Sequence, residues 1–170
     1  MTTTRVAERA GVSVGTLYQY YPNKQSLLFA VMHDHWGKLA AAVDAACEDA
    51  RHKPLSEMVR LVVEAFVDAK MQRPHISVAL YQIAAEVGGP ALVKRVSQRS
   101  RKAIEVMVQT APDVASAPDK FAIDMMVSAM SGATRSVLEA GASPATVRRL
   151  REQLVLLCQS YMAAVTGRRS

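Results

Sequence analysis

The 170-residue sequence has few of the features that carry a chain into or across a membrane. The segment after Met1 lacks the apolar stretch of a secretory signal peptide. No uninterrupted apolar run approaches the roughly 20 residues that a bilayer-spanning helix needs. We therefore expect a cytoplasmic protein.

Signs of catalysis are also scarce. The two cysteines, Cys47 and Cys158, form no C-x-x-C pair and are expected to be reduced residues packed in helices. No zinc-protease, phosphate-loop or dinucleotide fingerprint occurs. A serine does lie between Gly11 and Gly15, but between predicted helices rather than after a strand, which excludes a nucleophile elbow. We predict no enzyme activity, no metal and no cofactor.

Sheet-forming patterns are nearly absent, whereas helical ones run through the chain. No Asn-Gly or Asp-Gly hairpin turn occurs, and apolar residues recur at spacings of three and four. Because glycine and proline interrupt helices, their positions divide the chain. The predicted fold is all-α, with helices over residues 3–10, 14–20, 23–51, 54–72, 74–88, 90–110 and 119–140 and a last one from 144 onward.

The first 28 residues contain the most informative pattern. A short helix, expected to bury Val6, Ala7 and Ala10, ends at Gly11, where a left-handed backbone is needed. Ser13 then caps a second short helix from Val14 to Tyr20. Two short helices joined by a glycine-containing turn are typical of a helix-turn-helix, whose second helix enters the major groove of DNA.

Side chains on the second predicted helix suit contact with DNA. Thr16 offers a methyl group and a hydroxyl to base edges, and Gln19 can pair with adenine through two hydrogen bonds. The hydroxyls of Tyr18 and Tyr20 lie where phosphates run, and Lys24 opens the next helix. The formal net charge of +6 is compatible with a nucleic-acid partner but is too common to decide the matter.

The run from Ala10 to Leu27, AGVSVGTLYQYYPNKQSL, resembles the DNA-binding signature of TetR-family transcriptional regulators. Its fixed positions follow G-V-S-x-G-T-L-Y-x-Y-[FY]-x-x-K-x-x-L throughout. The resemblance implies N-terminal helices that bind a palindromic operator, and C-terminal helices that form a small-molecule pocket and a homodimer interface. Most members are repressors that their ligand releases from DNA.

Carried over position by position, the resemblance divides the DNA-binding residues into two groups. Groove-facing positions are Val14, Gly15, Thr16 and Gln19. Backbone-contacting positions are Tyr18, Tyr20 and Lys24, and Thr4 lies near the start of the supporting helix.

The family pattern includes a further helix before the position of Thr2, and we expect this sequence to lack most or all of it. A misassigned or internal start codon is the favoured explanation; a shortened chain or lost residues are the others. This departure motivates a second hypothesis, an interaction protein that dimerises or sequesters ligand without binding DNA.

The last two predicted helices suggest a homodimer. Small residues line one face of the first, and apolar residues recur at spacings of three and four on the second. The candidate interface residues are Ser128, Gly132, Ser136, Leu150, Leu154, Leu157 and Tyr161. Internal packing of the two helices against each other is the alternative. A dimer would pair two recognition helices with two half-sites.

The ligand pocket is less clearly specified. Aromatic residues and methionines of the middle helices could line a cavity, although core packing is the more common role for each of them. The candidates are Trp36, Phe66, Tyr81, Met107, Phe121 and Met125. Arg135 needs a partner, either a ligand anion or Glu139 one turn later. The expected organisation is a DNA-binding domain over residues 1–28 and a helical ligand-binding and dimerisation domain over 29–170.

Overall fold

Helices account for nearly all of the regular structure in the computed structural model, which describes residues 2–86 and 88–167. The described residues contain eight helices and no strand, confirming the predicted all-α fold. The helices are α1 (Thr3–Ala10), α2 (Val14–Tyr20), α3 (Lys24–Asp49), α4 (Leu55–Met71), α5 (Pro74–Ile83), α6 (Gly89–Val108), α7 (Lys120–Glu139) and α8 (Pro144–Thr166).

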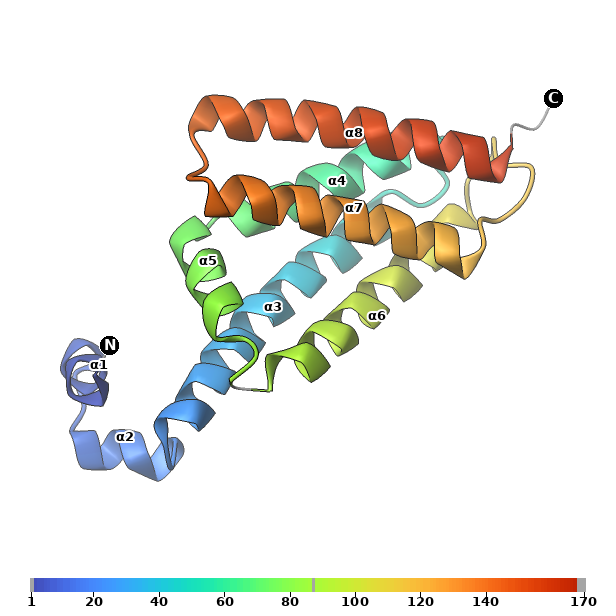
Figure 1. Ribbon diagram of the computed structural model, residues 1–170. Helices are drawn as coiled ribbons and strands as arrows, with labels where there is room; N and C mark the ends of the chain where they lie inside the picture. Colours follow the sequence, from blue (N-terminus) through green and yellow to red (C-terminus); the bar gives the residue numbers. More distant parts are fainter. Residues whose placement is uncertain (1, 87, 168–170) are drawn as a thin grey trace.

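The 26-residue helix α3 joins the two ends of the molecule (Figure 1). Its first turn packs Leu27 among α1 and α2, its middle buries Trp36 in a second apolar cluster, and its last turns bury Val43 and Cys47 in the main core. One continuous helix therefore contributes side chains to all three clusters.

The main core lies where α4 is covered by α3 on one side and by α7 and α8 on another. Cys47 and Cys158 are both buried there as free thiols, as predicted. Burial raises their pKa values to about 12 and about 11, so both thiols stay protonated at neutral pH. Among the described residues, no helix combines the length and apolar character needed to cross a bilayer.

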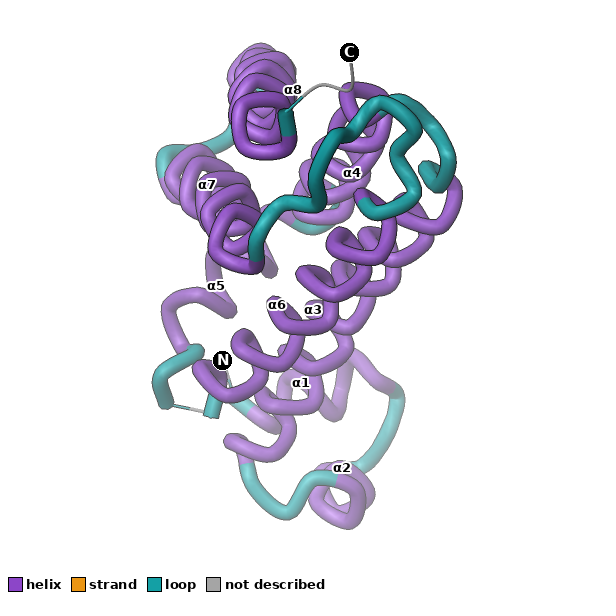
Figure 2. The backbone as a smooth tube through the Cα atoms, turned by 90° about the vertical axis from the view of Figure 1, so that its right-hand side faces the viewer, coloured by secondary structure: helices purple, strands orange, loops and turns teal. Residues whose placement is uncertain are grey.

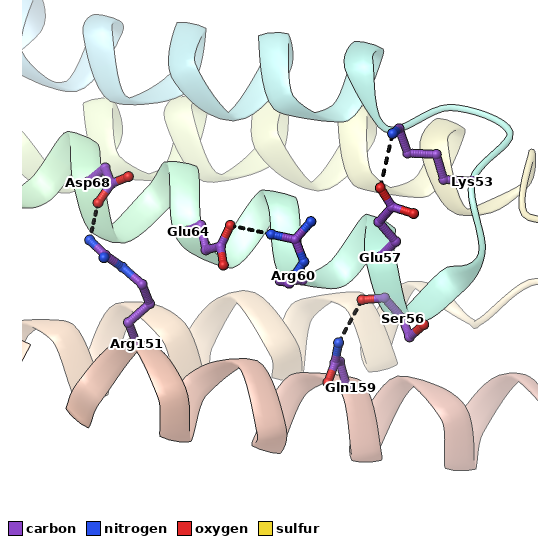
Figure 3. Close-up of polar contacts among 8 residues, drawn as sticks. All are labelled: Lys53, Ser56, Glu57, Arg60, Glu64, Asp68, Arg151 and Gln159. Atoms are coloured by element: carbon purple, nitrogen blue, oxygen red, sulfur yellow. Dashed lines mark hydrogen bonds and ion pairs between the residues drawn. The ribbon is translucent and has the colours of Figure 1, made fainter. Parts of the chain in front are cut away.

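Helices α7 and α8 run antiparallel in Figure 1, and Figure 2, which looks nearly along their axes, shows them side by side at one edge of the molecule. Polar contacts fasten α8 to α4 on both sides of its midpoint (Figure 3). Arg151 forms an ion pair with Asp68, and the Gln159 side-chain amide donates to the Ser56 carbonyl at 2.7 Å. These contacts lie at the edges of the face that α8 buries against α4, which carries Leu150, Leu154 and Cys158.

The turn between α5 and α6 depends on the absence of a side chain at Gly89. Its N–H donates to the Ala84 carbonyl at 2.7 Å, and a Cβ at Gly89 would lie 2.4 Å from that oxygen. Gly89→Ala should therefore lower the free energy of unfolding by about 1–3 kcal/mol, as overpacking does. Urea unfolding followed by circular dichroism measures this change.

Gly37→Ala is the matched control for Gly89→Ala. Gly37 lies inside α3, and a Cβ there would meet nothing within 4 Å. Alanine should therefore stabilise the protein by about 0.5–1 kcal/mol, because it loses less backbone entropy on folding. Equal destabilisation by the two substitutions would contradict the steric account of the turn.

Candidate DNA-binding surface and ligand cavity

Backbone geometry at Gly11 and Ser13 forms the turn between α1 and α2. Gly11 has φ +68°, and its N–H donates back into the last turn of α1. Two residues on, Ser13 Oγ accepts from the Thr16 N–H at 3.0 Å and caps α2. Both features follow the sequence prediction. They set the angle at which α2 leaves α1.

A small apolar cluster supports α2 from behind. Ala7 of α1, Leu17 of α2 and Leu27 of α3 are buried together. Val6 and Val14 pack against them, whereas Ala10, expected to be buried, is exposed. Ala10 instead borders a groove on the outer face of α1. The unit is thus a three-helix arrangement in which the first turn of α3 completes the core.

The candidate DNA-binding side chains lie on the outward surface of this unit. Tyr20 is 77% exposed and Tyr18 is 42% exposed. Gln19, Gly15, Thr4 and Lys24 are also exposed, whereas Val14 and Thr16 are half-buried. The Tyr18 hydroxyl lies 3.3 Å from Thr3 Oγ1, which holds the ring against α1. In Figure 1 the helices that carry these residues project from one end of the molecule.

A capping box that the sequence reading missed orders the start of α3. Asn23 Oδ1 accepts from the Ser26 N–H at 2.8 Å, and Ser26 Oγ accepts from the Asn23 N–H at 3.2 Å. The spacing of Asn23 and Ser26 could have indicated it. The box fixes the end of α3 from which Lys24 projects, next to the recognition helix.

A cavity of about 440 Å³ lies among α3, α4, α5, α6 and α7. Its volume falls within the range of small-molecule pockets, roughly 300–1,000 Å³. Its lining is mainly apolar, with Leu39, Val43, Val96, Ile104, Val127 and Met130 among the residues. In Figure 1, α5, α6 and α7 lie around the middle of α3.

Three of the six predicted pocket residues line this cavity: Trp36, Phe66 and Tyr81. Met107 does not, because it is fully buried in the main core. Phe121 and Met125 do not either, because they lie on the outer face of α7 and are 70% and 46% exposed. Helix α7 carries large apolar residues on two faces, and Met126 and Met130 occupy the inward one. The sequence pattern alone did not distinguish the inward face from the outward face.

The most unusual residue of the cavity, Lys70, was missed by the sequence reading. It is only 5% exposed, and its ammonium donates to the Tyr81 hydroxyl at 2.9 Å. The ammonium also lies 4.9 Å from the centroid of the Tyr81 ring and 5.8 Å from that of Trp36. Burial lowers the pKa of Lys70 from 10.5 to about 8. Lys70 follows Phe66 by four residues and so lies on the apolar face of α4. This position in the sequence could have indicated a buried lysine.

Arg135 also lines the cavity. Its Nε donates to Glu139 at 2.7 Å, which identifies Glu139 as the partner within the chain. The guanidinium carbon lies 4.8 Å from the centroid of the Tyr81 ring. Two cations therefore approach one aromatic ring at the same end of the cavity.

The predicted interface residues divide into two sets. Leu150 and Leu154 are buried in the chain's own core, where α8 packs on α4, so they cannot form an exposed face. Leu157 is 52% exposed, and Tyr161 is half-buried beside it. Ser128, Gly132 and Ser136 are exposed on α7. A shallow pocket between α7 and α8 brings Met125, Leu157 and Tyr161 together.

These features define a helix-turn-helix DNA-binding protein with an all-helical C-terminal region that encloses a cavity. Residues 54–162 match the family profile described as "Tetracyclin repressor-like, C-terminal domain", and residues 1–31 match "Bacterial regulatory proteins, tetR family". The chain belongs to the TetR family of transcriptional regulators, which are not enzymes.

A solved structure shows the same fold. The TetR family transcriptional regulator PfmR from Thermus thermophilus superposes with a TM-score of 0.67 at 16% sequence identity. The similarity covers 95% of this chain and 87% of that one. Among curated proteins, no significant match was found.

Proposed function

We propose that this regulator is a homodimeric repressor that a small molecule releases from a palindromic operator. The observation that carries the proposal is the position of α3. Its first turn supports the recognition helix through Leu27, and its middle lines the cavity through Trp36. A ligand that moves Trp36 therefore acts on the helix that also sets the orientation of α2.

Polar contacts strengthen the coupling between the cavity and α3. His35, the neighbour of Trp36, lies with Nε2 3.0 Å from Ser77 Oγ of α5. The Ser77 hydroxyl donates in turn to the Lys70 carbonyl at 3.4 Å. Burial lowers the pKa of His35, which keeps its ring neutral at pH 7. Helices α3, α4 and α5 are thus linked beside the cavity, and their relative shift is the proposed switch.

The proposed DNA contacts follow from the exposed surface of α2. Gln19 and Thr16, with Val14 and Gly15, are assigned to the major groove. Tyr18, Tyr20, Lys24 and Thr4 are assigned to the phosphate backbone. Residues 1–28 are the proposed DNA-binding domain, and residues 29–170 the ligand-binding and dimerisation domain.

Gln19→Ala and Tyr20→Ala should affect operator binding differently. Loss of the Gln19 amide should cost about 1–3 kcal/mol at the base it reads and relax the preference there. Loss of the Tyr20 hydroxyl should weaken binding to all sequences by a similar factor, because phosphate contacts carry no base information. Fluorescence anisotropy with single-base operator variants measures both effects. Equal losses across every operator variant for both substitutions would overturn the two assignments.

The proposed dimer uses the outer face of α7 and α8. Phe121 and Met125 of α7, with Leu156 and Leu157 of α8, are large apolar residues left exposed on these two helices. A two-fold axis would place the α7–α8 pairs of two copies together, with Ser128, Gly132 and Ser136 allowing close approach. Such a dimer would present two recognition helices to two half-sites.

Gel shifts with the intergenic DNA upstream of the gene test the proposed function. The protein should bind at least one palindromic segment there, and the addition of its effector should release it. Failure to bind any palindrome, in a protein that still dimerises and binds ligand, would favour the alternative. In that case the chain acts by dimerising or by sequestering ligand without binding DNA.

A further inference from the structure

Within the part of the chain that the structure describes, the ammonium of Lys70 has no carboxylate partner. The salt bridges found among residues 2–86 and 88–167 do not include Lys70, and its one side-chain hydrogen bond goes to Tyr81. A buried ammonium without a counter-ion is costly, and proteins seldom keep one without a compensating interaction. Three aromatic rings, those of Trp36, Phe66 and Tyr81, surround it instead.

Other polar groups lie near Lys70, and two of them, the Tyr81 hydroxyl and the Arg135 guanidinium, belong to residues that line the cavity. The indole Nε1–H of Trp36 is buried, and no acceptor for it was found among the described residues. The Tyr81 hydroxyl accepts from Lys70, which leaves its own proton free to donate. The Arg135 guanidinium carbon lies 4.8 Å from the centroid of the same Tyr81 ring. This end of the cavity therefore offers donors and positive charge, and its missing component is an anionic acceptor.

The rest of the cavity wall is mainly apolar, with four serines, Ser97, Ser100, Ser128 and Ser131, among its lining residues. Val43, Ile104, Val127 and Met130 line it, together with the Phe66 ring. Such a wall favours a hydrocarbon body and excludes a highly charged ligand, whose desolvation would not be repaid there. Because the cavity holds one buried ammonium, that of Lys70, it suits a ligand with one negative charge.

We propose that the cavity binds a monocarboxylate with an apolar body, whose carboxylate oxygens accept hydrogen bonds from Lys70 and Tyr81. Arg135, which also lines the cavity, adds a second positive charge beside the Tyr81 ring. The inference deepens the proposed function by naming the chemical class of the effector. It does not depend on DNA binding.

The binding test uses the fluorescence of Trp36, the only tryptophan of the chain, in the purified full chain. The probes are straight-chain carboxylates from hexanoate to dodecanoate and hydrocinnamate, each beside its alcohol of the same length. At least one carboxylate should bind tenfold or more tightly than its alcohol. If no carboxylate in the series exceeds its alcohol, the proposal is overturned.

Lys70→Met and Lys94→Met separate the buried site from general charge effects. Lys94 is exposed on α6, so its substitution should leave the preference for carboxylates intact. Lys70→Met should abolish that preference and leave alcohol binding within about threefold, because it removes the charge and keeps the apolar volume. Carboxylate binding by Lys70→Met at the affinity of the unsubstituted protein would contradict the proposal. Circular dichroism confirms that each variant is folded.

A separate gel shift distinguishes failure of this inference from failure of the proposed function. One outcome is that carboxylates bind in a way that needs Lys70 but do not change the affinity for the operator. The carboxylate site would then be supported, and its role in releasing the protein from DNA would be refuted. The other outcome is that the protein binds the operator but shows no preference for carboxylates over alcohols. The proposed DNA binding would then be supported, and the proposed monocarboxylate ligand would be refuted.

Discussion

Leu157→Glu should convert the dimer into monomers and abolish tight operator binding. Leu157 is 52% exposed on α8 and borders the same shallow pocket as Met125 of α7. In a two-fold dimer the substitution enters the interface twice, and each carboxylate is desolvated without a partner. The dimer dissociation constant should rise by about two orders of magnitude or more, as for a central interface residue. Analytical ultracentrifugation over a concentration series measures it.

The control for this experiment is Val31→Glu. Val31 is an apolar residue of similar exposure, 42%, but it lies on α3 rather than on α7 or α8. That variant should remain a dimer at the same concentrations. A dimeric Leu157→Glu protein, or a monomeric Val31→Glu protein, would place the interface elsewhere on the surface.

Lys70→Met should stabilise the ligand-free protein by about 2 kcal/mol at pH 7. The pKa of Lys70 is lowered from 10.5 to about 8, a difference equivalent to roughly 3 kcal/mol of penalty on the charged form. Methionine removes that penalty and loses the hydrogen bond to Tyr81, which offsets part of the gain. Urea unfolding at pH 7 measures the difference, and the same substitution should abolish carboxylate selectivity.

The pH dependence of stability offers an independent check on Lys70. Below pH 8 both the folded and the unfolded chain hold the lysine proton, so the penalty is fully present. Between about pH 8 and 10.5 the folded chain releases the proton while the unfolded chain keeps it. The free energy of unfolding contributed by this group therefore rises with pH across that window.

Three charged or titratable groups face Lys70, and one of them, Tyr81, acts in the opposite direction near pH 10 because burial raises its pKa. They are His35 of α3, Tyr81 of α5 and, beyond the Tyr81 ring, Arg135 of α7. The raised pKa values of Cys47 and Cys158 also lower the stability of every variant above pH 9, so the effect of Lys70 is read as a difference between variants. The free energy of unfolding of the unsubstituted protein and of Lys94→Met should increase relative to that of Lys70→Met as the pH rises from 8 to 10.5. Superimposable stability curves for the unsubstituted protein and Lys70→Met between pH 7 and 10.5 would show that Lys70 carries no such penalty.

The helices and the helix-turn-helix were predictable because local chemistry defines them. Gly11 supplies the left-handed turn, Ser13 caps α2, and Ser143 with Pro144 starts α8, all as the residue types indicate. The observed helix bounds differ from the predicted ones by a few residues at most places. The largest difference is at α5, which ends at Ile83 rather than close to Gly88.

Which face of a helix points inward was harder to predict. Helix α7 carries large apolar residues on two sides, Phe121 and Met125 outward and Met126 and Met130 inward, and periodicity alone does not choose between them. On α8, Leu150 and Leu154 match the interface pattern but are covered by α4. The choice is made by tertiary packing.

Lys70 shows a different limit of sequence reasoning. A lysine between apolar positions is ordinarily a surface residue, since its long stem allows the ammonium to reach water. Here the rings of Trp36, Phe66 and Tyr81, drawn from three helices, close over it. Only the assembled fold brings those rings together, so the cationic end of the cavity could not be read from α4 alone.

Selection of binding sites from a pool of random DNA duplexes tests the central claim most directly. The purified chain is incubated with the pool, bound duplexes are recovered over several rounds, and the enriched sequences are read. The account predicts enrichment of a palindrome, with altered base preference for Gln19→Ala and weaker recovery without altered preference for Tyr20→Ala. A pool that stays unenriched with a folded, dimeric protein would contradict the claim that this chain binds operator DNA.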